Sequence, residues 1–376
     1  MMKPRRLRGH SRTVTTCVAS RDRPGVMATA GEDGCICWFD MRSKDLLFTM
    51  DLGKKPISAI CFKPGNEDVL FASSGTEVMC FDLHMVSMWR PLETYNYNKE
   101  EINQIACNTK KPFLAATDDG GDIKIIDIQQ QCLYKTLRIG HTSICSSVQF
   151  VPWRPWEVIT GGLDSKLILW DFSKGRPCKV MDFGLSEVDS QSNAGQCFNP
   201  AFVHALAVPE VDMLDNSGKV CSVARGDGIV DVIDVELELA AVKSKGPVKP
   251  QKRLESAAVN KLNAGSAAHA DIKEKRIRLD YSLGGHTAAV SCVSFSLFGE
   301  RGKLIASGGN DASVKLWDYS KYLNPGESSS SSDRSGVLRQ NINLNKKVNW
   351  LCTTPTDSEN LVVCDTSKVV KVYTVA

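Results

Sequence analysis

The sequence has no apolar run that approaches the ~20 residues of a transmembrane helix, so we expect no membrane span. Residues 1–10 are basic and lack an apolar stretch, and they therefore do not predict a secretory signal. Asn-x-Ser/Thr glycosylation acceptors are absent. The net charge of +3 over 376 residues is too small to indicate nucleic acid or an acidic membrane as the main ligand. These absences predict an intracellular protein, nuclear, cytoplasmic or both.

The motifs of several enzyme classes are missing as well. The sequence contains no Gly-x-x-x-x-Gly-Lys-Ser/Thr phosphate loop, no Gly-x-Ser-x-Gly nucleophile turn and no His-Glu-x-x-His zinc helix. The 14 cysteines are scattered, mostly through apolar runs, where thiols act as small buried hydrophobes. We also find no carboxylate pair spaced for general acid–base work. The sequence therefore predicts a protein that is not an enzyme and that needs neither a cofactor nor a metal.

What the sequence does contain is a repeat with a period of about 40–45 residues in its regular part. A complete copy has a Gly-His pair, a Ser or Thr on a strand, and an Asp four residues later. An aromatic residue follows that Asp by six positions and precedes a closing Asp. The two copies that close with tryptophan contain His141, Thr160, Asp164 and Trp170, and His286, Ser307, Asp311 and Trp317.

Five further copies bring the total to seven. One runs from Gly9-His10 to Phe39-Asp40, and four weaker ones close at Phe81-Asp82, Ile126-Asp127, Ile233-Asp234 and Tyr373. Since buried polar groups need partners, the four polar side chains of a complete copy predict one hydrogen-bonded chain. We therefore interpret the histidines of the Gly-His pairs as structural, in preference to catalytic or metal-binding, and expect the two tryptophan blades to be the stiffest.

Repeats of this period are typical of β-propellers, in which each blade is a four-stranded antiparallel sheet. The chain ends on a third-strand run at 369–375, so the last blade lacks an outer strand. Residues 5–8, which precede the first Gly-His pair, can supply that strand and remove the open sheet edge. We expect residues 1–376 to form a single all-β, seven-bladed propeller that is monomeric on its own.

Three segments do not fit the blades. Residues 182–196 form a polar loop, 241–278 a basic insertion that we expect to be disordered, and 325–336 a serine-rich loop. The basic insertion is explained either as a nuclear import signal or nucleic-acid contact, or as a solvated insertion without a specific role.

Two features fall on the propeller face that carries the connections between strands one and two and between strands three and four. Arg42 follows the closing Asp40 by two positions, and it is the only firmly cationic residue at that place in any copy. It is either a rigid fork for recognition or an ordinary surface ion pair. Trp153 and Trp156 lie in a proline-containing loop, where they either anchor a partner or cover the edge of a blade.

The repeats resemble the WD-repeat family over nearly the whole chain. Runs at 100–103, 123–127, 141–148, 162–164, 199–204 and 347–351 are similar to those of WD repeat-containing protein 53 and its relatives. That resemblance implies a substrate receptor of cullin-4 ubiquitin ligases, docked on the ligase's damaged-DNA-binding adaptor. The associated motif is matched by residues 27–42, with Asp40 and Arg42 at its end and Phe39 in place of the commoner tryptophan.

Two functions remain open at this point, and both are non-catalytic. In the first, the protein presents an unknown substrate to the ligase through its adaptor. In the second, it is a general WD-repeat scaffold of a chromatin, ribosome-assembly or signalling complex without a ligase contact. Arg42 favours the first and the basic insertion favours the second. A fold resemblance alone does not establish either of them.

Overall fold

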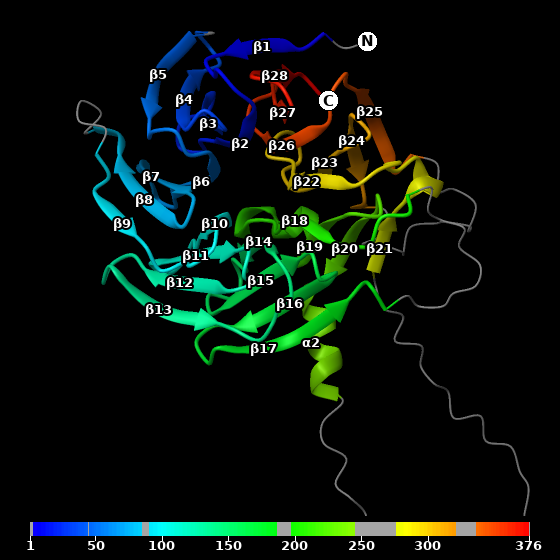
Figure 1. Cartoon of the computed structure of the whole chain (residues 1–376). Coiled ribbons are helices and arrows are strands. Elements are labelled where there is room, and N and C mark those ends of the chain that lie inside the picture. The colour runs from blue at the N-terminus through cyan, green and yellow to red at the C-terminus, as the bar shows by residue number, and fades with distance from the viewer. Residues whose placement is uncertain are drawn as a thin grey trace, which may run out of the picture.

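The computed structural model describes residues 3–43, 45–84, 90–185, 197–244, 276–320 and 336–375. These residues form seven four-stranded antiparallel sheets, arranged as blades around a ring (Figure 1). The innermost strand of each blade contacts that of the next, and β26 of the last blade contacts β2 of the first. The predicted seven-bladed propeller is confirmed.

The first three blades follow one another with short connections. The first blade contains β2 (Val14–Ala19), β3 (Val26–Gly31), β4 (Cys35–Asp40) and β5 (Asp45–Asp51). The second contains β6 (Ile57–Lys63), β7 (Asn66–Ser74), β8 (Glu77–Asp82) and β9 (Glu93–Tyr95). The third contains β10 (Ile102–Cys107), β11 (Phe113–Asp118), β12 (Ile123–Asp127) and β13 (Cys132–Leu137).

The next three blades carry the longer connections. The fourth contains β14 (Cys145–Phe150), β15 (Glu157–Gly162), β16 (Lys166–Asp171) and β17 (Arg176–Asp182). The fifth contains β18 (Val203–Ala207), β19 (Val220–Arg225), β20 (Val230–Asp234) and β21 (Arg276–Leu279). The sixth contains β22 (Val290–Phe295), β23 (Leu304–Gly309), β24 (Ser313–Asp318) and β25 (Leu338–Asn343). Short helices lie between strands: η2 (Val211–Met213), α1 (Leu214–Ser217), α2 (Val235–Ser244) and η3 (Tyr281–Leu283).

The seventh blade joins the two ends of the chain. It contains β26 (Val348–Thr353), β27 (Leu361–Asp365) and β28 (Val369–Tyr373), and its outer strand is β1 (Arg5–Arg8). The register pairs Arg5 with Val372 and Leu7 with Val370, and Leu7 is buried. The predicted closure of the ring by the N-terminal strand is therefore confirmed, and β28 does not remain an open edge.

The hydrophobic core is divided among the contacts between blades. The described residues form seven apolar clusters, and each joins side chains of two neighbouring blades. Because each sheet packs on both of its faces, β3 and β19, the second strands of the first and fifth blades, are buried along their whole length. Such two-sided burial explains why β3, and β19 up to its last residue Arg225, consist of apolar and small residues without a polar alternation.

The ends of the three predicted insertions belong to the propeller. Asp182 closes β17, and only residues 186–196 of the polar loop lie outside the described residues. Within the predicted insertion at 241–278, α2 continues to Ser244 and β21 begins at Arg276, so both ends are regular elements of the fifth blade. Residues 245–275 lie outside the described part of the chain. Of 325–336, only Gly336 is described.

The antiparallel order gives the ring two different faces. Face A carries the connections between strands one and two and between strands three and four of each blade. Face B carries the turns between strands two and three and the connections between blades. Helix α2, which follows the third strand of the fifth blade, projects from the rim of the ring (Figure 1). Within the described residues, no helix has the length and apolar character needed to cross a membrane.

Candidate protein-interaction sites

The two complete sets of repeat side chains are joined by hydrogen bonds. In the fourth blade, Trp170 Nε1 donates to Thr160 Oγ1 at 2.9 Å, and His141 Nε2 lies 2.8 Å from the same oxygen. His141 Nδ1 lies 2.9 Å from the Asp164 carboxylate. Since an ionised carboxylate only accepts, Nδ1 carries the imidazole proton, and Thr160 donates to Nε2. All four groups thus serve the stability of the blade.

The sixth blade repeats this chain with serine in place of threonine. Trp317 Nε1 donates to Ser307 Oγ at 2.8 Å, His286 Nε2 lies 2.8 Å from that oxygen, and His286 Nδ1 lies 3.0 Å from Asp311. The imidazole of His286 is buried. Burial lowers the pKa of His286, although the hydrogen bond to Asp311 opposes this shift. A neutral, fully engaged imidazole is a structural group.

The first blade keeps His10, Thr29 and Asp33 but has Phe39 as its aromatic residue. His10 Nε2 lies 2.8 Å from Thr29 Oγ1 and Nδ1 lies 3.1 Å from Asp33. Phe39 is buried and offers no donor to Thr29. The chain of hydrogen bonds in this blade is therefore one bond shorter than in the tryptophan blades.

Asp40 and Arg42 form a bidentate ion pair on face A of the first blade. Arg42 Nε donates to Asp40 Oδ1 and Nη2 donates to Oδ2, both at 3.1 Å. The backbone N–H of Arg42 also donates to Oδ1, at 2.9 Å. These bonds from Arg42 lower the pKa of Asp40. The Arg42 side chain is 71% exposed, so the carboxylate fixes the guanidinium in one direction while leaving it accessible.

The loop that carries Arg42 is held from two sides. Met41 N–H donates to Gly25 O at 2.7 Å, which ties the loop to the connection between β2 and β3. Arg5 of β1 donates through Nη1 to Met41 O at 2.6 Å and to Glu359. The ring-closing strand thus also positions the exposed Arg42. The sequence did not indicate this role for Arg5, because the contact joins the first blade to the last.

At most of the positions equivalent to Arg42 in the other blades, only the backbone N–H donates to the closing Asp. The N–H of His84, Gln129 and Glu236 donates to the closing Asp of its own blade, at 2.8 to 3.0 Å. Among these positions, the first blade is the one that adds a side-chain fork to the turn. The turn shared by the blades explains why the repeat closes with Asp. The bidentate contact between its guanidinium and Asp40 distinguishes Arg42 from the residues at the equivalent positions.

Trp153 is used within the molecule. It packs against the cluster between the fourth and fifth blades, and its Nε1 donates to Glu236 Oε1 at 3.1 Å. The neighbouring Arg154 donates to both oxygens of Glu236, at 2.9 and 2.5 Å. This loop therefore clamps the start of α2, and the structure places Trp153 in that clamp.

Trp156 lies on the other side of the same loop, between the third and fourth blades. Its ring centroid is 5.8 Å from that of Phe113 and 5.5 Å from that of Phe172. Lys111 Nζ stands 5.2 Å from the ring centroid. Trp156 is 39% exposed, so it covers the aromatic cluster and still offers part of its ring to solvent. The structure separates Trp153 and Trp156 from Arg42 by placing them across the ring.

Comparison with known proteins agrees with this architecture. The family profile described as "WD domain, G-beta repeat" matches residues 2–40, 131–171 and 278–318. The chain is a seven-bladed β-propeller that contains WD repeats. The three matched segments end with the third strands of the first, fourth and sixth blades, which are the blades with the Gly-His pair and its hydrogen-bonded chain.

Curated relatives share the repeat to different extents. The chain is 25% identical to WD repeat-containing protein 53 homolog of Dictyostelium discoideum, covering 98% of this chain and 94% of that protein. It is 26% identical to GATOR2 complex protein WDR24 of Danio rerio, over 40% of this chain and 20% of that protein. It is 25% identical to Ribosome biogenesis protein ERB1 of Malassezia globosa, over 35% of this chain and 16% of that protein.

The fifth WD repeat departs from the pattern in a way that creates a cavity. In the first, fourth and sixth repeats, the histidine lies four residues before the first strand, and the glycines Gly31, Gly162 and Gly309 make room for its ring. In the fifth repeat Asn199 takes the place of the histidine and Arg225 that of the glycine. Asn199 is exposed, and the Arg225 guanidinium bonds Asp227, the equivalent of the repeat's turn aspartate.

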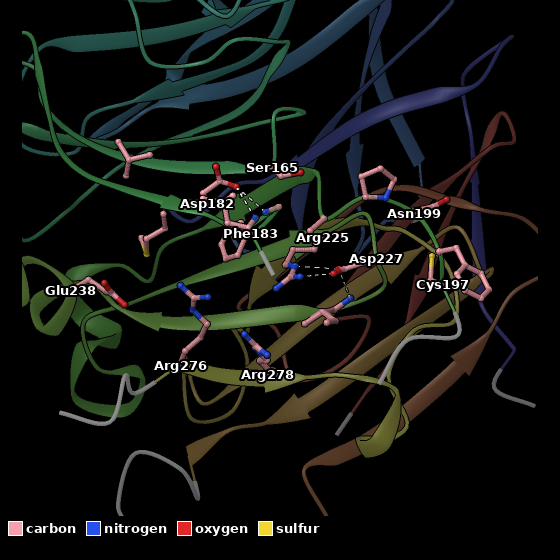
Figure 2. Close-up of a pocket in the computed structure, with 18 of the residues that line it drawn as sticks. Ser165, Asp182, Phe183, Cys197, Asn199, Arg225, Asp227, Glu238, Arg276 and Arg278 are labelled. Atoms are coloured by element: carbon pink, nitrogen blue, oxygen red, sulfur yellow. Dashed lines mark hydrogen bonds and ion pairs between the residues drawn. The ribbon is translucent and has the colours of Figure 1, made fainter. Parts of the chain in front are cut away.

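The resulting cavity has a volume of about 670 Å³ and lies between β17 and β21 (Figure 2). Arg225 forms its inner wall and also donates to Asp231 Oδ2 at 2.6 Å. The Phe183 ring lies near two guanidinium groups, 4.9 Å from Arg225 Cζ and 5.1 Å from Arg276 Cζ. Asp227 can be recognised in the sequence as the turn aspartate of the repeat. The signal that could have predicted this cavity is Arg225, an arginine at a position where the complete repeats have glycine.

Proposed function

We propose that this WD-repeat propeller is a substrate receptor of a cullin-4 RING ubiquitin ligase, and that it docks on the ligase's damaged-DNA-binding adaptor through face A. The observation that carries the proposal is the exposed, bidentate Asp40–Arg42 pair at the end of β4. Similarity to WD repeat-containing protein 53 homolog over nearly the whole chain supports the same proposal. In this proposal the protein acts as a non-catalytic scaffold.

Arg42 is suited to such a contact because little ordering remains to be done on binding. Its guanidinium is already aligned by Asp40, and its loop is tied to Gly25 and Arg5. Side chains that are held in place before binding lose less conformational entropy in the complex. Arginine with a fixed fork is also a typical centre of binding energy at protein interfaces.

The test is direct binding of purified adaptor to the purified full-length chain at physiological salt. We expect Arg42→Ala to weaken the affinity at least tenfold, with Arg42→Lys between the wild type and alanine because lysine lacks the fork. Lys174→Ala is the matched control. Lys174 is also an exposed cation beside a closing aspartate, Asp171, on face A of another blade. Equal loss in the control would indicate a general charge effect.

The possible outcomes test the docking residues and the receptor function separately. Binding that survives Arg42→Ala would retain the ligase and reject Asp40 and Arg42 as the docking residues. In that case Trp156 and its surroundings would be tested next. Absence of binding by the folded wild-type chain would reject the receptor proposal.

A scaffold of a different complex is the second candidate function. The partial similarity to a protein named as part of the GATOR2 complex and to a protein named for ribosome biogenesis favours this role. In that case the chain would assemble with the other subunits of its complex, and the ligase adaptor would not be one of them. Purification of the tagged chain from cells, with the adaptor present in or absent from its stable complexes, distinguishes the two.

A further inference from the structure

The cavity of the fifth blade has an unbalanced set of charges. Four cationic side chains line it, Lys179, Arg225, Arg276 and Arg278, together with three carboxylates, Asp182, Asp227 and Glu238. Each carboxylate has a partner inside the protein. Asp182 accepts from the N–H groups of Gly184 and Leu185, Asp227 pairs with Arg225, and Glu238 lies 2.8 Å from Lys179.

Arg276 is different from these groups. Within the described residues its guanidinium has no hydrogen bond or ion pair, and its Nε is buried without a partner. Its one contact of a specific kind is with the face of the Phe183 ring. Figure 2 shows the Arg276 side chain rising from β21 toward Phe183 and the cavity. A buried N–H without an acceptor carries a desolvation cost that an oxyanion would remove.

Two apolar side chains stand at the rim of the same cavity. Phe198 is 99% exposed and Leu185 is 76% exposed, and both are among its lining residues. Phe198 directly precedes Asn199, which stands where a complete WD repeat has its histidine. The fifth repeat therefore presents apolar surface outward at the point where other repeats turn a side chain inward.

We propose that this cavity, on the rim next to face B, binds an acidic side chain of a partner protein through Arg276. The partner's carboxylate receives a charge-assisted hydrogen bond from Nε and a terminal N–H of Arg276, while an adjacent apolar side chain packs against Phe198 and Leu185. Arg225 is a positioning residue, because its own N–H groups are engaged by Asp227 and Asp231 and it contacts Phe183.

The size and charge of the cavity fit a peptide better than the other anionic partners. Its volume of about 670 Å³ matches a few side chains, within the usual range of binding pockets. Arg276 is one cation without an acceptor among the described residues, far fewer than the six to ten phosphate contacts typical of a nucleic-acid interface. The site also does not depend on ligase docking, since Arg42 lies on face A and the cavity does not.

The test uses the purified full-length chain on an immobilised array of random-sequence decapeptides. We expect the bound peptides to be enriched in Asp or Glu next to an apolar residue. The strongest peptide is then resynthesised with its acidic residue changed to Asn or Gln, and its affinity is measured by fluorescence anisotropy. We expect a loss of at least tenfold for the amide peptide on the wild-type chain.

Variants of the chain complete the assignment. Arg276→Gln should weaken the acidic peptide at least tenfold and abolish the preference for acid over amide, with unchanged thermal unfolding. Arg276→Lys should retain part of both. Arg12→Gln is the matched control, since Arg12 is exposed in the connection between β1 and β2 on face B. It should bind as the wild type does.

Three results would overturn the proposal. The first is an array without acidic enrichment, and the second is equal acid-to-amide discrimination by wild type and Arg276→Gln. The third is binding of acidic peptides by the double variant Glu187→Gln, Asp189→Asn but not by the wild-type chain. That result would assign Arg276 to the chain's own segment 186–196, which lies outside the described residues, and not to a partner.

Discussion

Arg154 and Glu236 join the fourth blade to the fifth through two parallel hydrogen bonds, from Nε and Nη2 to the two carboxylate oxygens. The pair connects a loop of face A to the first turn of α2. Trp153 adds a third bond to Glu236, and Arg154 also reaches Glu157. The two positions are 82 residues apart in sequence, so this clamp depends on the packing of the fourth blade against the fifth.

The clamp should make a modest contribution to stability. Because both side chains are partly exposed, solvent screening limits the coupling energy, and we expect about 1 kcal/mol between Arg154 and Glu236. A double-mutant cycle of Arg154→Ala and Glu236→Ala, followed by chemical unfolding, measures it. The bond from Arg154 lowers the pKa of Glu236, so the coupling should fall as the pH drops through the acidic range. A coupling of zero at neutral pH would contradict the assignment.

The Gly-His pair of the fourth blade requires glycine for a steric reason. A Cβ at Gly140 would overlap the Trp170 ring at Cζ2 and Cη2. We expect Gly140→Ala to displace the tryptophan, break its bond to Thr160 and destabilise the protein by about 2 kcal/mol. Unfolding curves and tryptophan fluorescence check this. Gly120→Ala, where the nearest atom is 3.3 Å from the new Cβ, should change stability much less.

Ring closure depends on an apolar contact of the N-terminal strand. Leu7 of β1 is buried in the cluster between the last and first blades, whereas the neighbouring Arg8 is exposed. Leu7→Ala should lower the free energy of unfolding by about 2 kcal/mol or more, and Arg8→Ala by less than about 0.5 kcal/mol. Similar effects for the two variants would show that β1 adds nothing through its buried side chain.

The sixth blade should lose stability in acid in two steps. Burial lowers the pKa of His286, so the unfolded chain takes up a proton at higher pH than the folded one. The contribution of His286 is therefore complete above the ordinary histidine pKa and declines as the pH falls below it. Comparison of the wild type with His286→Gln from pH 7 to pH 5 should show the stability difference narrowing. A constant difference would contradict the neutral imidazole.

The second step belongs to Asp311. Burial raises its pKa, but the hydrogen bonds from His286, Ser313 and the Thr287 N–H and the electrostatic interaction with His286 together outweigh burial and bring the pKa to about 2. Its contribution is thus present above the ordinary aspartate pKa and is lost as the pH falls toward about 2. Wild type and Asp311→Asn should therefore converge in stability below about pH 4. Persistence of the full difference at pH 2 would exclude an ionised Asp311 in the folded protein.

The sequence was sufficient for the ring and its closure because these depend on residues at fixed spacing. The distance from Asp164 to Trp170 recurs in two other repeats, and residues 5–8 precede the first repeat where an outer strand is needed. The candidate sites were less predictable. Trp153 is held inside the molecule by its hydrogen bond to Glu236, and Arg276 contacts the face of the Phe183 ring. Both contacts are made between blades, where spacing within one repeat carries no information.

Pairing of β1 with β28 has a consequence for the order of events during synthesis. Among the described strands β1 is synthesised before all others, and its partner β28 is synthesised after all others. The other blades can form while translation continues, but the seventh sheet is complete only when β28 has been released. Until then the Arg5 contact that holds the Arg42 loop lacks Glu359 as its second partner. A product truncated before Glu359 would thus contain Asp40 and Arg42 without the full support of their loop.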